Sequence, residues 1–425
     1  MRYLYSALLY ILFPLVLLRM LWRSRRAPGY RQRLAERFGI ASIGLGSAAP
    51  VIWVHAVSVG EVLAAEPLLE QLLADYPDHQ LLLTTTTPTG SQRAKALFGD
   101  RVHHVYAPWD LPGSVSRFLR RTRPSLLLLM ETELWPNLLH ACHARGCPVV
   151  LANGRMSARS ARGYARFGAI TRSMLAQLTR VACQSAVDGE RFLSLGLPPQ
   201  SLTVTGNVKF DLQVDVAMHA RAAELRRELD ADNRPVLVAA STHAGEEELV
   251  LQAFARLRQS FGDCLLVLVP RHPERFDAVY ALCVSQGWQV LRRSSGVAPA
   301  AGDAILLGDT MGELRLLFAA ATVAFIGGSL VEHGGHNALE ACVWGVPVLS
   351  GPHTFNFEEI TGLLTAAGAM LVLQEPGQLG ACLQNLLDDP VRCKEMGQAG
   401  KRVLAQNSGA RKRLLELVGR ELGGA

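Results

Sequence analysis

The sequence predicts an α/β protein built from two parallel sheets, each sandwiched by helices. Short apolar runs alternate with segments of helical periodicity along most of the chain, in the βα order that produces parallel sheets. This rhythm breaks once, around "TGNVKFDLQVD" at 205–215, and starts afresh at "RPVLVAAST". The chain of 425 residues, 49% hydrophobic and 19% charged, is long enough for two domains with sizeable cores, and its composition excludes a disordered chain.

The first 25 residues are predicted to form a membrane anchor. Residues 3–22 are nearly all apolar, interrupted by Pro14 and Arg19, and about 20 such residues can span a bilayer. The basic cluster "RSRR" at 23–26 follows the apolar run, whereas a secretory signal carries its charges in front. Because basic residues stay on the cytoplasmic side, we expect the rest of the chain at the cytoplasmic face of the inner membrane. Full spanning and a partly interfacial position both remain open, since Arg19 would have to snorkel.

The net charge of +6 indicates an anionic partner. Nucleic acid, an anionic membrane surface and a phosphorylated substrate all fit the charge taken alone. The eight cysteines are scattered without a disulfide framework, which is typical of a reducing compartment.

The two halves are predicted to have the same architecture. Residues 26–208 form the first domain and residues 235–410 the second, joined by a linker at 209–234 that carries a polar helix, and a last helix at 411–425 can cross back onto the first domain. Right-handed crossovers make both sheets doubly wound, so ligands are expected in the cleft where their carboxyl edges meet. The expected strands are 51–55, 80–86, 101–106, 125–130, 148–152, 180–183 and 202–205, then 235–240, 264–269, 288–291, 304–307, 322–326, 346–349 and one near 370.

Polar clusters follow several predicted strands of the second half. Thr310 and Glu313 have the spacing of a capping box, with Thr310 as the helix N-cap. The stretch "GGHNALE" at 334–340 is predicted to start a helix whose free N–H groups can hold a phosphate, with Glu340 one turn in and able to accept hydrogen bonds from a ribose. Caps, turns and glycine-mediated packing explain each motif singly, but their recurrence at successive strand ends favours a nucleotide site.

Glu61 follows the strand at 51–55, at the point where a helix is expected to begin. A carboxylate in the first turn of a helix is favoured by the helix dipole, so Glu61 can be a plain helix-start residue. The alternative is an active-site group, because the turn opens at the carboxyl end of a parallel sheet.

The first half offers further candidates. Glu131 and Glu133 end another buried strand. Lys209, at the domain junction, is either an ordinary surface lysine or a cation that reaches into the cleft. The arginines of "GRMSARSARGYARF" at 154–167 fit either a solvated helix face or contact with a phosphorylated lipid.

Nine motifs together resemble the transferases of 3-deoxy-D-manno-octulosonic acid (Kdo) that act in lipopolysaccharide assembly. Their order and spacing match this family from the anchor to about residue 365, with no departure at any motif position. The motifs are "SVGE", "TTTTPTG", "METELWPN", "NGRMS", "VTGNVKFD", "STHAGEEE", "PRHPERF", "MGEL" and "GGHNALE".

The resemblance implies a GT-B glycosyltransferase fold with two Rossmann-like domains, and an inverting transfer of Kdo from CMP-Kdo to a lipid A precursor, lipid IVA. It implies that Glu61 is the proton-accepting base and that Glu131 and Lys209 stabilise the transition state. No nucleic-acid partner, no cofactor and no metal is then expected. The resemblance places the CMP contacts at Pro270, Arg271, Met311, Gly312, Glu313, Asn337, Ala338, Leu339 and Glu340.

Two rival functions stay open. A transferase of a UDP-linked sugar, or a sugar-nucleotide epimerase, would share the fold and the glycine-rich second half, but would not explain the anchor together with "GNVKFD" and "ETELW". A non-catalytic nucleotide- or lipid-binding protein at the membrane is the second rival, and Glu61 and Glu131 argue against it. Release of CMP from CMP-Kdo separates a catalyst from a binding protein.

Overall fold

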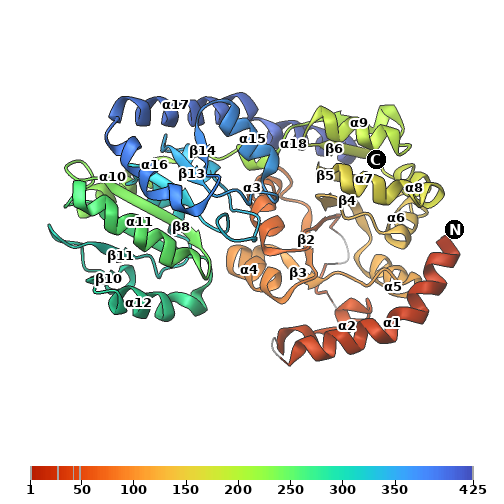
Figure 1. Cartoon of the computed structure of the whole chain (residues 1–425). Coiled ribbons are helices and arrows are strands. Elements are labelled where there is room, and N and C mark those ends of the chain that lie inside the picture. The colour runs from red at the N-terminus through yellow and green to blue at the C-terminus, as the bar shows by residue number, and fades with distance from the viewer. Residues whose placement is uncertain (1, 26–27, 42, 47–48, 424–425) are drawn as a thin grey trace. The chain divides into compact units, whose positions relative to one another are not determined.

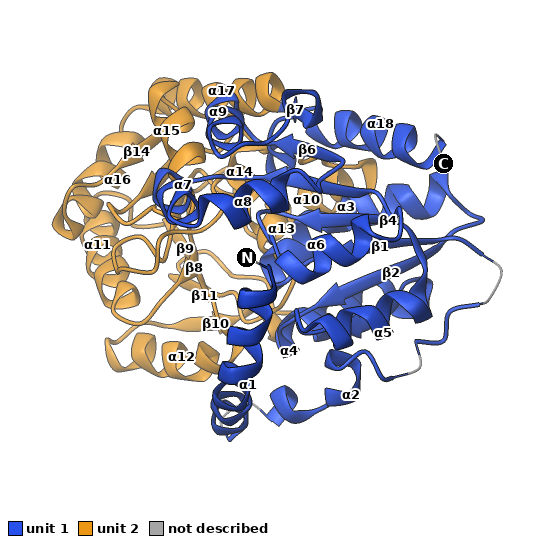
Figure 2. Ribbon diagram, turned by 90° about the vertical axis from the view of Figure 1, so that its right-hand side faces the viewer, with its two compact units in different colours: residues 1–211, 408–425 blue, residues 212–407 orange. Residues whose placement is uncertain are grey.

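The computed structural model of the chain describes residues 2–25, 28–41, 43–46 and 49–423. Met1 of the predicted anchor and Arg26 of the basic cluster lie outside the described residues. The chain divides into two compact units, which Figure 2 shows in different colours: unit 1 is residues 1–211 with 408–425, and unit 2 is residues 212–407. Each unit contains its own parallel sheet, which confirms the predicted α/β class.

The sheet of unit 1 has seven parallel strands in the order β3-β2-β1-β4-β5-β6-β7. The strand order reverses between β1 and β4, which pair directly. In open α/β sheets ligands bind at such a switch point, outside the carboxyl ends of the strands. The strands are β1 (Val51–His55), β2 (Gln80–Thr85), β3 (His103–Tyr106), β4 (Pro124–Met130), β5 (Val149–Gly154), β6 (Arg180–Cys183) and β7 (Leu202–Val204).

Helices cover both faces of this sheet because successive strand residues point to opposite sides. In β1, Trp53 packs in one core cluster with Phe118, and Ile52 packs in the other with Leu68. The C-terminal helix α18 adds Leu414 and two neighbours to the second cluster, so the chain end belongs to unit 1. The helices are α1 (Arg2–Ser24), η1 (Pro28–Arg31), α2 (Leu34–Arg37), α3 (Val59–Asp75), α4 (Pro88–Phe98), η2 (Gly99–Arg101), α5 (Pro112–Thr122), α6 (Pro136–His143), α7 (Ala158–Ala165), α8 (Gly168–Leu175), α9 (Ala186–Ser194), η3 (Pro199–Ser201), η4 (Val208–Phe210) and α18 (Ala410–Gly423).

The sheet of unit 2 also has seven parallel strands, in the order β10-β11-β9-β8-β12-β13-β14, and its switch point lies between β8 and β12. The strands are β8 (Val236–Thr242), β9 (Leu265–Pro270), β10 (Val290–Arg292), β11 (Ile305–Leu307), β12 (Val323–Ile326), β13 (Val348–Ser350) and β14 (Met370–Val372). The helices are α10 (Val216–Glu228), α11 (Glu246–Ser260), η5 (Pro273–Arg275), α12 (Phe276–Ser285), η6 (Arg293–Ser295), α13 (Leu314–Phe318), α14 (Leu339–Cys342), α15 (Glu358–Ala366), η7 (Pro376–Gln378), α16 (Leu379–Leu387) and α17 (Pro390–Asn407).

Two local expectations in unit 2 were wrong. The helix expected from "GGHNALE" begins only at Leu339, because Gly334 and Gly335 have φ values of 87° and 75°, outside the helical region. Glu340 is therefore the second residue of a short helix and does not lie one turn into it. Thr310 is not an N-cap: Gly312, with φ 85°, delays the helix, and Glu313 itself occupies the N-cap of α13.

Candidate active site

Glu61 lies in the first turn of α3, directly after β1 at the switch point of unit 1. Ser58, the N-cap of this helix, accepts a hydrogen bond from the Glu61 N–H (3.4 Å) and donates its hydroxyl to Glu61 Oε1 (2.9 Å). The Val57 N–H donates to Glu61 Oε2 (2.8 Å). This reciprocal pattern is close to a capping box, so Glu61 does stabilise the start of α3.

The same surroundings give Glu61 the proton affinity of a general base. Burial raises the pKa of its carboxyl from 4.5 to about 7; the hydrogen bonds from Val57 and Ser58 oppose the rise, and the charges of Glu131 and Glu133 add to it. A helix start alone favours the ionised carboxylate and would lower the pKa. A carboxylate that titrates near neutral pH is instead suited to take a proton during catalysis.

Glu131 follows β4, the strand that pairs with β1 at the switch point. Its φ of 54° lies in the left-handed region, and strained residues of this kind gather at functional sites. Lys209 Nζ lies 3.3 Å from Glu131 Oε1, which makes an ion pair between residues far apart in the sequence. Because the charge of Glu131 also acts on Glu61, the three predicted catalytic residues share one edge of the sheet.

Side chains from two further strand ends position Lys209. The Lys209 N–H donates to Asn207 Oδ1 (3.0 Å), and Asn207 Nδ2 donates to Gln184 Oε1 (3.0 Å), just after β6. The Val208 N–H donates to Asn153 Oδ1 (3.1 Å), in β5. The Nδ2 of Asn153 is buried with no hydrogen-bond partner in the described part of the chain. Such buried unpaired donors are rare.

The structure distinguishes Glu133 from Glu131. Trp135 Nε1 donates to Glu133 Oε2 (2.9 Å), whereas Glu131 carries the ion pair with Lys209. Burial raises the pKa of the Glu133 carboxyl, and the charge of Glu131 adds to this effect. Burial is the main cause of the raised pKa of Tyr164 on α7, and the charge of Glu133 adds to the rise.

The arginine-rich segment 154–167 contains the whole of α7, a helix with no buried residue. Arg159, Arg162 and Arg166 are exposed. This exposure fits both open interpretations, a solvated helix face and a surface that meets a phosphorylated lipid.

Histidines gather at the switch point of unit 2. His243, just after β8, and His336, in the loop after β12, have their Nε2 atoms 2.9 Å apart; His333 stacks on His243 with ring centroids 4.1 Å apart. Burial, with the charges of the other histidines and Arg271, lowers the pKa of His243 to about 4 and that of His336 to about 3. These two imidazoles are neutral at pH 7, so Arg271 supplies positive charge here. In the ranges that the structure describes, no group of three or more His, Cys, Asp or Glu residues is arranged to hold a metal ion.

Three of the expected CMP-contact residues lie together at this edge. Asn337 hydrogen-bonds the Glu340 carboxyl, and the charges of Arg315 and Arg271 act on it. Burial raises the pKa of Glu340 despite these partners. A half-buried carboxyl, a guanidinium and an amide are suited to the hydroxyls and phosphate of a nucleotide.

The other expected CMP positions have different surroundings. Pro270, Ala338 and Leu339 are buried, so only their backbone can meet a ligand. Met311 is 66% exposed and adjoins Gly312 in the loop after β11.

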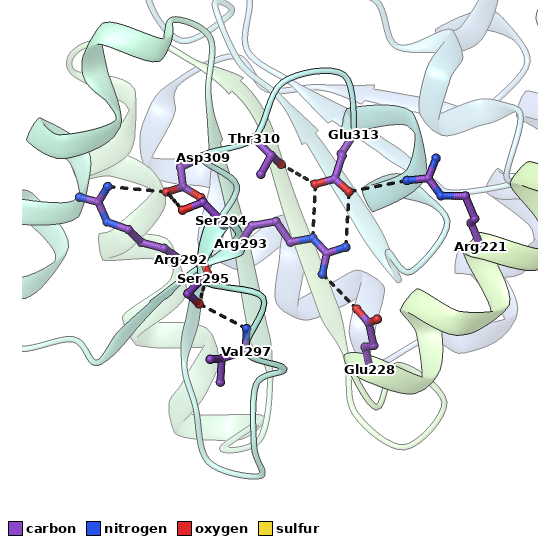
Figure 3. Close-up of polar contacts among 10 residues, drawn as sticks. All are labelled: Arg221, Glu228, Arg292, Arg293, Ser294, Ser295, Val297, Asp309, Thr310 and Glu313. Atoms are coloured by element: carbon purple, nitrogen blue, oxygen red, sulfur yellow. Dashed lines mark hydrogen bonds and ion pairs between the residues drawn. The ribbon is translucent and has the colours of Figure 1, made fainter.

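Glu313 holds the loop after β11 in place. Figure 3 shows its carboxylate between two arginines: Arg293 Nε and Nη2 each lie 3.4 Å from an oxygen, and Arg221 Nη2 lies 3.8 Å from Oε1. The Thr310 hydroxyl also donates to Glu313 (2.5 Å), and Arg293 pairs with Glu228 (3.0 Å). Partial burial raises the pKa of Glu313, but these partners outweigh it and leave the pKa below its ordinary value.

Glu246, at the start of α11, was not among the predicted site residues. Its side chain is fully buried and accepts four backbone N–H groups, two on each oxygen. The donors are His243 (2.9 Å), Gly328 (2.6 Å), Ser329 (2.9 Å) and Leu330 (2.8 Å). One carboxylate thus joins the loop after β8 to the glycine-rich loop after β12, across the switch point.

Glu247 does the same for the next loop. It is also fully buried and pairs with Arg275 through contacts of 2.5 and 3.0 Å, which fixes the loop after β9 that carries Arg271. A sequence signal exists for both residues. Both glutamates lie on the buried face of α11, at helical spacing from Val250 and Leu251, the next buried residues of that face.

Comparison with known proteins identifies related sequences and folds. Residues 32–212 match the family model described as 3-Deoxy-D-manno-octulosonic-acid transferase (kdotransferase). A 3-deoxy-D-manno-octulosonic acid transferase of Haemophilus influenzae is 44% identical over 420 residues, covering 98% of each chain. One of Bordetella pertussis is 40% identical over 435 residues, also covering 98% of each chain.

Solved structures at low identity share the fold. The UDP-GlcNAc 2-epimerase from Neisseria meningitidis bound to UDP-GlcNAc has a TM-score of 0.57 at 16% identity and covers 87% of this chain and 99% of that chain. A glycosyltransferase from Rickettsia africae has a TM-score of 0.57 at 12% identity and covers 89% of this chain and 100% of that chain. At these identities the likeness concerns the fold alone.

Proposed function

The chain belongs to the 3-deoxy-D-manno-octulosonic acid (Kdo) transferase family, and from this premise we propose that it transfers Kdo from CMP-Kdo to lipid IVA, the lipid A precursor, with inversion at the anomeric carbon. The observation that carries this proposal is Glu61, whose pKa burial raises to about 7 beside the ion pair of Glu131 and Lys209. These groups lie at the switch point of a doubly wound sheet, where such folds bind their ligands.

Glu61 acts as the general base. A sugar hydroxyl is a weak nucleophile until a positioned carboxylate takes its proton in the transition state. The hydroxyl oxygen bonds to the anomeric carbon of Kdo while the bond from that carbon to the CMP phosphate oxygen breaks. The proton ends on Glu61 and CMP leaves. Attack from the side opposite the leaving group inverts the configuration in one displacement, with no covalent intermediate.

Lys209 and Glu131 stabilise the charges that accompany this step. Kdo carries its own carboxylate, and we assign Lys209, which is 3.3 Å from Glu131, as the cation that meets it. Positive charge develops on the sugar ring as the leaving group departs, and the carboxylate of Glu131 favours it.

Unit 2 binds the CMP part of the donor. Arg271 stabilises the negative charge of the departing phosphate. Glu340, supported by Asn337, accepts hydrogen bonds from the ribose hydroxyls. The proposed mechanism requires no metal ion, so we expect the transfer activity to be unchanged by an added chelator.

The acceptor is a lipid, and two features of unit 1 suit it. Helix α1 is, among the residues the structure describes, the one long and apolar enough to cross a membrane, with a mean hydropathy of 2.0. The exposed arginines of α7 suit the phosphates of an anionic lipid. We therefore place the protein at the cytoplasmic face of the inner membrane.

The direct test is product analysis after incubation of the full chain with CMP-Kdo and tetraacyl lipid IVA. We expect a lipid product heavier by one or more Kdo residues, equal release of CMP, and the anomeric configuration opposite to that of the donor. Transfer from a UDP-linked sugar, epimerisation of a nucleotide sugar, or CMP-Kdo binding without product would each overturn the proposal.

Arg271→Ala and Glu340→Ala are expected to weaken CMP binding. Each removes charge-assisted hydrogen bonds worth about 1.5–3 kcal/mol, which corresponds to roughly 10- to 150-fold in the dissociation constant. Isothermal titration with CMP measures the effect. Arg256→Ala, which removes an exposed arginine of α11, is the matched control and should leave the affinity unchanged. Unchanged CMP affinity in both site variants would contradict the nucleotide site in unit 2.

A further inference from the structure

One face of α1 rests against the rest of unit 1. Near its start, Ser6 Oγ donates to Asn137 Oδ1 of α6 (2.9 Å), and the Tyr5 hydroxyl hydrogen-bonds the Asp110 carboxyl. At its middle, the Phe13 ring meets Trp109 edge-on, with ring centroids 4.7 Å apart. Figure 1 shows the helix running past α6, α5 and α2. The buried or half-buried residues of the helix are Arg2, Tyr5, Ser6, Leu9, Phe13, Leu17, Met20 and Ser24, spaced three or four apart.

The opposite face of α1 is apolar and uncovered. At 3.6 residues per turn, a second stripe spaced three or four residues apart lies on the side turned away from unit 1. Its members and their exposed fractions are Leu4 (68%), Leu8 (52%), Ile11 (72%), Leu15 (61%), Leu18 (62%) and Trp22 (63%). Basic side chains flank the stripe near its C-terminal end, at Arg19, Arg23 and Arg25. A long apolar stripe beside basic residues is typical of helices that bind anionic membrane surfaces.

The contacts with unit 1 are incompatible with a helix that crosses the membrane. Its 23 residues would span about 34 Å, roughly the thickness of the hydrocarbon core. A crossing would therefore carry Ser6 and Tyr5 to the far side and break their hydrogen bonds to Asn137 and Asp110. Asp110 also caps α6, accepting the N–H groups of Asn137 (3.1 Å) and Leu138 (2.7 Å), so the docking site is part of the folded unit.

We propose that α1 lies flat on an anionic phospholipid surface, docked on unit 1 by one face and inserted by the Leu4-to-Trp22 stripe, and that it does not cross the bilayer. This inference rests on the membrane association in the proposed function and adds the orientation. Trp22 lies at headgroup level, and Arg19, Arg23 and Arg25 meet lipid phosphates. Transfer then takes place with unit 1 held against the membrane by the helix.

The test measures how deep three positions of the stripe lie in a membrane. Leu4→Cys, Ile11→Cys and Leu18→Cys, each with Cys382→Ser to remove a partly exposed thiol, are labelled with a fluorophore in the full chain. The proteins are bound to vesicles of phosphatidylethanolamine and phosphatidylglycerol, with quenchers at the headgroup or at the acyl-chain ends. We expect the same shallow depth at all three positions, because a helix that lies parallel to the membrane surface keeps all its residues at one depth.

A graded profile, with Ile11 at the bilayer centre and Leu4 reached from the vesicle interior, would overturn the flat orientation and leave membrane association intact. No quenching at any position would overturn membrane association itself, and the orientation with it. Ile11→Ser should weaken partitioning to these vesicles by about tenfold or more, since a large apolar side chain leaves the lipid. Val391→Ser on α17 is the control, because Val391 is similarly exposed (68%) and should not affect partitioning.

Discussion

Glu246→Gln is expected to lower the free energy of unfolding by about 2–4 kcal/mol and to raise the KM for CMP-Kdo by about tenfold or more. The carboxylate accepts four backbone N–H groups, and glutamine offers one oxygen and one amide group that is itself a donor. Each carboxylate oxygen accepts two of these N–H groups, so two buried N–H groups lose their acceptor when the amide replaces one oxygen. The loop containing Gly328 and Ser329 loses the group that fixes it beside His243, so the donor site loosens along with the fold.

Three adjacent glutamates provide the comparison within one helix turn. Glu248 is exposed, whereas Glu246 and Glu247 are fully buried, so Glu248→Gln should match the parent protein in urea unfolding and in donor KM. A purely structural role for Glu246 would reduce the amount of active enzyme without changing KM. The positioning role requires that KM rise while kcat, measured at saturating donor, changes less. Parent-like KM in Glu246→Gln would contradict it.

The sheets could be predicted because their strands are buried on both faces. Such strands read as continuous apolar runs, as in "SLLLLM" of β4 and "LLVLV" of β9, and the helices between them have a different period. Fourteen expected strands appear in the structure at their expected places, within a few residues.

Side-chain roles that depend on tertiary contacts were harder to predict. At the start of α11, Glu246 and Glu247 are buried whereas Glu248 is exposed. The loops that face the helix determine which of these glutamates are buried. The helix expected at "GGHNALE" begins later than expected for a related reason. Gly334 takes a left-handed conformation, and a Cβ there would lie 2.4 Å from Asn356. This contact between Gly334 and Asn356 cannot be predicted from the sequence around Gly334.

The N-terminal helix shows a further limit. Hydrophobic periodicity in a sequence identifies a helix with a single apolar face. Helix α1 instead has two apolar faces, one that packs on the rest of unit 1 and one that is uncovered. A helix apolar on all sides resembles a membrane span in sequence. Hydrogen bonds such as the one between Ser6 and Asn137 separate a docked helix from a spanning one, and they join residues more than 100 positions apart.

Glu61→Gln is expected to reduce turnover by about two to four orders of magnitude while leaving the fold intact. Glutamine can still accept from the Val57 N–H and can donate its amide to Ser58 Oγ, so the start of α3 keeps its hydrogen bonds. It cannot take a proton. CMP affinity should be unchanged, because the nucleotide contacts are assigned to unit 2. A variant that transfers Kdo at a rate near that of the parent would return Glu61 to a helix-start role alone.

The pH dependence supplies an independent readout of the same residue. Burial raises the pKa of Glu61 to about 7, so the carboxyl is protonated and inactive as a base below that pH and ionised above it. The parent kcat/KM should therefore fall about tenfold per pH unit below pH 7 and level off above it. The free energy of unfolding depends on pH in the opposite direction. The folded state binds the Glu61 proton more tightly than the unfolded chain does, so this proton stabilises the fold at low pH. The stabilisation is lost as the pH rises through 7. Glu61→Gln should remove both dependences together.

The two glutamates of "ETELW" complete the test of the base. Glu131→Gln should cost more turnover than Glu133→Gln, because Glu131 holds Lys209 whereas Glu133 is bonded to Trp135. Removing either negative charge also removes a cause of the raised pKa of Glu61, so the acidic limb of the kcat/KM profile should shift to lower pH in both variants. A limb that stays at the parent position in Glu131→Gln, Glu133→Gln and Glu61→Gln alike would mean that another group carries the proton.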